Sequence, residues 1–150
     1  MTAPKPGRSR VRLLALSALA FILGIASVVL VNLAGPAFIE SALPGSLAED
    51  GMPLTTGSRV LFKGVIVAAG LAGAAVVAVA APIRPVLHRW ILLGIYLVVD
   101  TGAVVALWDS QPRWFTLLIL PLVFPQVWLG GRLGLALRER RRAEGKEAGR

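Results

Sequence analysis

The sequence predicts an all-α membrane protein in which four transmembrane helices form an antiparallel bundle. Of the 150 residues, 56% are hydrophobic and only 16% are charged, which is too apolar for an ordinary soluble domain. Four apolar runs are long enough, as helices, to cross a hydrocarbon core of about 30 Å. The last three runs are joined by short polar segments, which would make successive helices antiparallel neighbours.

The first span is expected at residues 13–34, after a basic cytoplasmic segment at residues 1–12. A secretory signal peptide is the alternative. Its apolar core would be roughly 7 to 15 residues, shorter than this run, and Asn32-Leu33-Ala34 is a poor cleavage site. The span carries a stripe of small residues that would allow another helix to approach closely. These residues are Ser17, Ala20, Gly24 and Ser27.

Residues 35–57 contain three prolines and four glycines but no basic residue. This composition predicts an external loop, with a short interfacial helix near residues 37–43. The second span, expected at residues 60–82, is dominated by alanine and glycine, which favours the central position in the bundle. A pore-lining helix is the alternative, although small residues more often serve packing. Two series of small residues recur at four-residue spacing: Gly64, Ala68 and Ala72, and Gly70, Ala74 and Ala78.

The third and fourth spans are expected at residues 90–108 and 114–135. Two prolines in the segment 82–89 separate the second span from the third, and residues 109–113 form another tight turn. Pro121 and Pro125 lie inside the fourth span. Each removes one backbone hydrogen bond and crowds the preceding turn, so a kink is predicted near these residues.

The charges predict the orientation of the membrane domain, residues 13–137. Thirteen basic residues lie in the N-terminal segment, the 82–89 turn and the region from Arg132 onward, against three on the opposite side. This asymmetry predicts that the chain spans the plasma membrane with both termini in the cytoplasm. Anionic lipid headgroups are then the expected partners of the basic tail, residues 138–150. The lipid-interface residues predicted there are Arg138, Arg140, Arg141 and Arg142.

Asp100 is the strongest anomaly, because it is a carboxylate in the middle of the third span with no charged residue beside it. An intramembrane acid costs roughly 2.5 to 3.5 kcal/mol to insert and marks a candidate functional site. Tyr96 lies one turn earlier on the same helical face, and Thr101 is adjacent. Gln126 and Lys63 lie on other spans at depths from which they could approach the carboxylate.

Two interpretations of Asp100 remain open. In the first, the carboxylate is structural and holds helices together by hydrogen bonds to Tyr96, Gln126 or Ser27. In the second, it binds a proton or a cation in a cavity beside the proline kink. Lys63 lies about one turn inside the outer end of its helix, from where it could also snorkel to the interface.

Several classes of function are disfavoured by the residues that the chain lacks. There is no cysteine, and His88 is the single histidine, so thiolate chemistry and imidazole-rich metal sites are not expected. Nucleophile elbows, phosphate loops and nucleic-acid reader motifs are missing from the sequence. We therefore expect no enzyme, no cofactor, no metal and no nucleic-acid partner. High arginine, alanine and glycine content suggests a bacterial source.

The remaining hypothesis is a non-catalytic subunit, assembly factor or interaction partner of a larger membrane system. The alternative is a small transporter or channel component that uses Asp100 for proton or cation coupling. Four spans are few for a transport pathway, so this alternative requires a homo-oligomer.

Overall fold

The computed structural model describes residues 6–147, and within this range it is helical, with no β-strand. The elements are α1 (Pro6–Ala42), α2 (Thr56–Ala80), α3 (Pro85–Leu107), α4 (Arg113–Leu117) and α5 (Ile119–Glu147). α1, α2, α3 and the continuous stretch Arg113–Glu147 are each long and apolar enough to cross a membrane. The all-α class is thus confirmed, as is the presence of four helices with the length and composition of membrane spans. Residues 1–5 and 148–150, which belong to the predicted basic termini, lie outside the described range.

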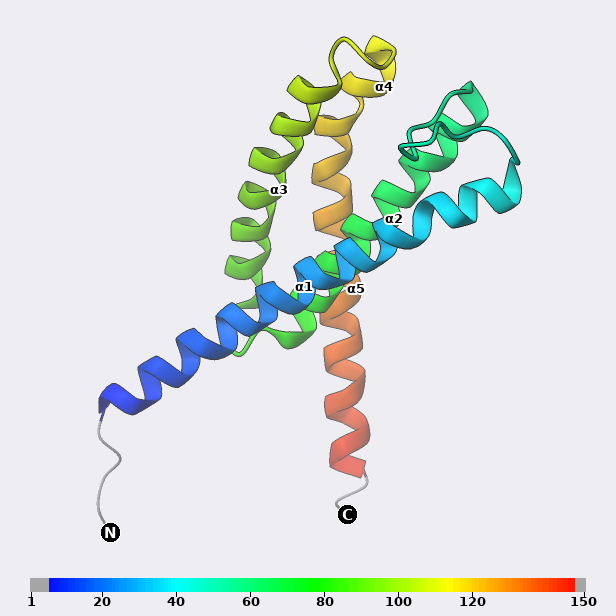
Figure 1. Cartoon of the computed structure of the whole chain (residues 1–150). Helices are drawn as coiled ribbons and strands as arrows, with labels where there is room; N and C mark the ends of the chain where they lie inside the picture. The colour runs from blue at the N-terminus through cyan, green and yellow to red at the C-terminus, as the bar shows by residue number, and fades with distance from the viewer. Residues whose placement is uncertain (1–5, 148–150) are drawn as a thin grey trace.

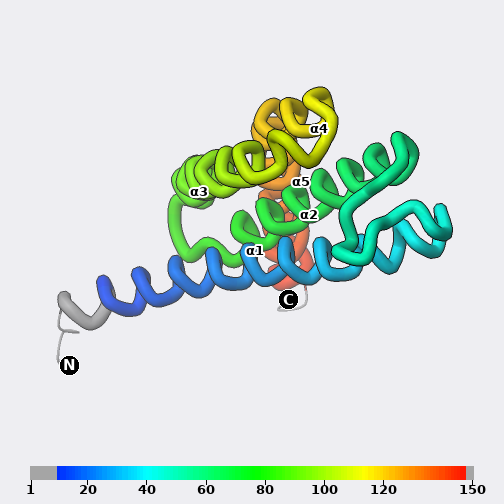
Figure 2. The backbone as a smooth tube through the Cα atoms, turned by 45° about the horizontal axis from the view of Figure 1, so that its top comes forward, coloured from blue at the N-terminus to red at the C-terminus, as the bar shows by residue number. Residues whose placement is uncertain are grey.

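α2 is the central helix, as its small residues predict. It packs against α1, α3 and α5, and both views place it between α1 and α5 (Figures 1 and 2). α1 meets α3 where the Phe21 ring stacks on His88 at a centroid distance of 5.3 Å. Beyond this contact α1 and α3 diverge (Figure 1). Residues of α1, α2, α3 and α5 border a cavity in this region.

The small-residue stripe of α1 packs on α2. Ala20 and Gly24 are buried, and a Cβ atom added to Gly24 would collide with the side chain of Val77. Gly73 of α2 packs equally closely on α1, because a Cβ atom added to it would lie 2.5 Å from a methyl group of Val28. The two backbones are therefore in close contact, which is the role predicted for the stripe.

A second close contact joins α2 to α5, and we call it the α2–α5 seam. Gly70, Ala74 and Ala78 of α2 are buried. Ala74 and Ala78 face Gly130 and Gly134 of α5 and form the seam, while Gly70 lies against Gln126, next to it. A Cβ on Gly130 would lie 2.9 Å from that of Ala74, and one on Gly134 would lie 2.7 Å from that of Ala78. The second small-residue series of α2 was therefore correctly interpreted as a packing face. Gly64 of the first series is exposed and packs against nothing.

The prediction that residues 35–57 form a loop is wrong at its beginning, because α1 continues to Ala42. The separate helix expected near residues 37–43 is the last part of α1. Pro36 removes only one hydrogen bond from the helix, while Gly35 packs on Val65 of α2 and Ile39 is fully buried. These contacts with α2 outweigh the local preference for a break. The loop is therefore shorter, and α2 starts with a capping box between Thr55 and Ser58.

The helix that contains Pro121 and Pro125 is interrupted at Leu118, between α4 and α5, one turn before Pro121. Pro121 cannot donate to the carbonyl of Leu117, and its ring crowds that carbonyl. The Leu118 amide bonds back to the Trp114 carbonyl at 3.2 Å. Pro121 then occupies the first turn of α5, where proline is tolerated. Pro125 lies within α5 without ending it.

Candidate functional site

Asp100 lines a cavity of about 300 Å³ that is formed by residues of α1, α2, α3 and α5. We call it the Asp100 cavity. Most of its walls are aliphatic, from residues such as Ile25, Val28, Ile66 and Ile119. Four polar side chains also line it: Asn32, Tyr96, Asp100 and Gln126. Three of the five predicted polar residues, Asp100, Tyr96 and Gln126, are thus brought together around one cavity.

Gln126 reaches the cavity because the helix opposite it carries a glycine. A Cβ atom on Gly70 would overlap the Gln126 amide, so only glycine leaves space for this side chain. Gln126 is 3% exposed, and its Nε2 atom has no hydrogen-bond partner among the described residues. A buried amide donor without a partner is energetically unfavourable.

Tyr96 is placed in a similar way. Its hydroxyl lies over Gly73, where a Cβ atom would collide with the oxygen. This hydroxyl is also buried and has no partner in the described part of the chain. Two unused donors and one carboxylate therefore surround a space large enough for several water molecules or a small ligand.

The other two predicted residues lie elsewhere. The Thr101 hydroxyl donates to the Leu97 carbonyl of its own helix at 2.6 Å, and the residue is exposed. Lys63 does not snorkel outward, because it is only 7% exposed and its Nζ lies 3.9 Å from the centre of the Phe115 ring. A cation over an aromatic face is stabilised by the ring quadrupole. Phe115, which the sequence does not mark, supplies this contact from α4.

The hydrogen bonds expected for a purely structural Asp100 are not formed. Within residues 6–147, Tyr96 Oη and Gln126 Nε2 are without partners, so neither bonds the carboxylate. Ser27 donates instead to the Gly24 carbonyl of its own helix at 2.7 Å. The structural interpretation of Asp100 therefore loses the three partners on which it depended.

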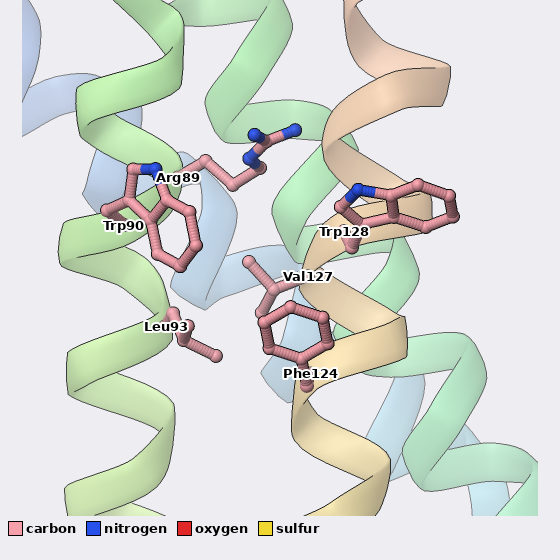
Figure 3. Close-up of a pocket in the computed structure, with 6 residues that line it drawn as sticks. All are labelled: Arg89, Trp90, Leu93, Phe124, Val127 and Trp128. Atoms are coloured by element: carbon pink, nitrogen blue, oxygen red, sulfur yellow. The ribbon is translucent and has the colours of Figure 1, made fainter.

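A small gap between α3 and α5 has no room for a ligand. Figure 3 shows Arg89 reaching from α3 towards α5, where Phe124 and Trp128 project. The enclosed volume is about 10 Å³, which is close to the minimum for one water molecule. The stem of Arg89 lies against Gly131, so this region serves helix packing.

The predicted lipid-interface arginines fall into two groups. Arg138 and Arg142 line a cavity together with Arg84, which precedes α3, whereas Arg140 and Arg141 do not. Arg138 is half-buried, and the other three tail arginines are exposed. No set of histidine, cysteine or acidic residues within residues 6–147 is arranged to hold a metal ion. No protein family matches the sequence, and comparisons with characterised proteins and with solved structures give no significant match.

Proposed function

We propose that this chain is a non-catalytic, multi-pass protein of the plasma membrane that acts as a subunit, assembly factor or interaction partner of a larger membrane system. The outer face of α3 carries the proposal. Gly94 and Gly102 lie eight residues apart on that face, with Val98 between them. Both glycines have open space where a Cβ would be, and Val98 is 76% exposed.

Within residues 6–147, no helix packs against the two glycines of this face. Small residues on one helical face permit close contact between helices in lipid. The small-residue stripe of α1 and the α2–α5 seam are occupied within the chain. The α3 face is therefore suited to a transmembrane helix of another protein, or of a second copy of this chain.

Copurification from native membrane tests this proposal. Gly94→Leu fills the space that a partner helix would occupy, and we expect it to reduce recovery of the partner by about tenfold, as loss of about 1.4 kcal/mol predicts. Gly64→Leu is the matched control, since Gly64 is equally open but faces the α1–α2 side. Equal recovery with both variants would contradict a partner site on α3.

The proposal includes an alternating, antiparallel course of the four spans, with both termini in the cytoplasm. Tryptophans support it, because they favour the two headgroup layers. Trp90 and Trp108 lie near the two ends of α3, separated by about 27 Å at the helical rise. Thirteen basic residues on one side against three on the other support the orientation.

Reporter fusions test the topology. A fusion after Gly51 should report an external location, while fusions after Pro85 and Arg150 should report the cytoplasm. The physical reason is that segments rich in lysine and arginine are retained on the cytoplasmic side. A cytoplasmic signal at Gly51 would overturn the arrangement of four spans.

The Asp100 cavity favours a second candidate function, an oligomeric transporter or channel component that binds a proton or a cation at Asp100. Ionisable residues beside cavities within a membrane commonly belong to such pathways. Two unpartnered donors at this cavity support a role in binding water or a ligand. The Asp100→Asn variant, described in the Discussion, separates the two candidates.

A further inference from the structure

A second cavity, of about 340 Å³, lies where the connection between α2 and α3 meets α5. Three of its lining residues are basic and one is acidic, and apolar residues complete the wall. The charged residues are Arg84, Arg138, Arg142 and Glu139. Because one carboxylate cannot neutralise three guanidinium groups, the cavity is suited to an anion. We call it the arginine pocket.

Arg138 has hydrogen-bonding capacity at this pocket that the described residues do not use. Its Nη1 atom is buried and has no hydrogen-bond partner among the described residues. A guanidinium group has donors but no acceptor, so this nitrogen needs an oxygen from outside the helices. Phosphate and carboxylate oxygens match the planar donor fork of arginine.

Arg84 is held at the pocket by an unusual backbone. Its φ of 46° and ψ of 59° are left-handed, and it is the only non-glycine residue with positive φ in residues 6–147. Glycine is the usual residue in this conformation. The Arg84 carbonyl accepts from the amides of Leu87 and His88 at 2.9 and 3.3 Å, which stabilises the turn from which the Arg84 side chain extends.

The first turn of α3 adds to the positive potential. No side chain caps this helix end, and the first turn contains no acidic residue. The amino end of a helix carries a partial positive charge and exposed amide groups, so an anion near it is stabilised. This contribution is independent of the arginine side chains.

We propose that the arginine pocket binds the phosphate group of an anionic phospholipid. Apolar residues at the pocket favour a lipid over a soluble phosphate. Ile83 is 48% exposed and, with Leu135, borders the pocket, so acyl chains have a surface to follow. Arg84 lies about 9 Å beyond Trp90 at the helical rise, and tryptophan marks the headgroup layer. Basic pockets between helices at this level recognise anionic headgroups.

The test is lipid binding by the full chain, purified in a neutral detergent and measured by native mass spectrometry. Phosphatidylglycerol is the probe, and phosphatidylcholine is the zwitterionic comparison. We expect Arg138→Gln to weaken phosphatidylglycerol binding by about fivefold or more, and Arg140→Gln by less than about twofold. Both variants lose one positive charge from the same helix, but Arg140 lies outside the pocket. Equal weakening by both would show a diffuse surface effect and overturn the proposal.

The Arg84→Gly variant tests whether a loss of phosphatidylglycerol binding could instead be caused by misfolding. Glycine adopts positive φ without strain, so this variant should melt at or above the temperature of the native chain. It should nevertheless lose phosphatidylglycerol binding by about fivefold or more. Native lipid affinity in Arg84→Gly and Arg138→Gln would overturn the proposal.

Inorganic phosphate is used to distinguish a phospholipid headgroup from free phosphate as the ligand of the arginine pocket. At matched ionic strength, replacing chloride by phosphate should not raise the melting temperature as phosphatidylglycerol does. If inorganic phosphate stabilises the native chain but not Arg138→Gln, while phosphatidylglycerol binds both equally, the ligand is a soluble phosphate and the lipid assignment is wrong.

Discussion

Two parts of α2 are packed in opposite ways. Along the α2–α5 seam, glycine and alanine bring the two backbones so close that a Cβ at Gly130 would collide with the backbone of Leu71. Nearer its amino end, at Ile66 and Gly70, the same helix borders the Asp100 cavity of about 300 Å³, which residues of α1, α3 and α5 also line. Helix association in lipid depends on van der Waals packing and hydrogen bonds, because burial of apolar surface gives little driving force there.

The comparison assigns different roles to the two regions. The seam supplies the contacts that hold the helices together, and its glycine and alanine residues carry no polar side chains. The cavity lacks such packing contacts. Two donors at it, Tyr96 Oη and Gln126 Nε2, have no hydrogen-bond partner within residues 6–147. Such groups are unfavourable for folding, so the cavity is a candidate site for function. Three substitutions test this division, in order of decreasing effect on stability.

Gly130→Leu should have the largest effect. The added side chain would meet the backbone of Leu71 and Cβ of Ala74, neither of which can move aside without shifting α2. We expect a loss of about 3 kcal/mol in the free energy of unfolding, as is typical of severe overpacking. The measurement is thermal unfolding of the detergent-purified chain.

Gly64→Leu provides the control for this substitution. It adds the same bulk to α2, but the space beside Gly64 is open. The control should change stability by less than about 0.5 kcal/mol. Comparable melting of the two variants would mean that the seam does not hold the fold.

Gln126→Met tests the cavity side and should stabilise the protein. Methionine keeps the unbranched shape of the side chain and removes an amide whose nitrogen has no partner. Relief of a buried unsatisfied group is worth about 1 kcal/mol, measured as a rise in melting temperature. Gln111→Met is the control, because the Gln111 oxygen accepts from Arg59 Nε at 3.1 Å and should not gain stability. A fall in stability for Gln126→Met would indicate that the amide binds water or a ligand in the cavity.

The sequence was most informative where the physics is local or periodic. Apolar length predicts the spans, and the four-residue repeat from Gly70 to Ala78 predicts a packing face of α2. Two boundaries depended on tertiary contacts and could not be predicted locally. The burial of Ile39 carries α1 past Pro36, and the effect of Pro121 appears one turn earlier, at Leu118.

The candidate site was predicted only in part for a similar reason. Asp100 and Tyr96 share one helical face, so spacing alone relates them. The approach of Gln126 depends on Gly70 of another helix, and that register is not readable from periodicity. The Phe115 ring beneath Lys63 and the position of Arg84 at the arginine pocket depend equally on contacts between separate elements.

Asp100→Asn should have the smallest effect on stability and the most informative effect on function. Asparagine keeps the size of the side chain but cannot ionise. Tyr96 and Gln126 do not bond Asp100 directly. We therefore expect the free energy of unfolding to change by less than about 0.6 kcal/mol, which is the mean contribution of an interhelical hydrogen bond in a membrane. If Asp100 binds a proton or a cation, this stable variant will fail to complement a deletion strain, while Asp100→Glu will retain partial function.

Thr101→Val is the matched control for Asp100→Asn, because it changes the neighbouring polar residue, whose hydroxyl bonds only its own helix. It should be stable and should complement fully. Full complementation by both variants would remove the transport candidate and leave the partner face of α3 as the functional surface. If Asp100→Asn is unstable while Thr101→Val is not, Asp100 is structural and acts through water in the cavity rather than through direct contacts. The proposed division of roles between the seam and the cavity is then wrong.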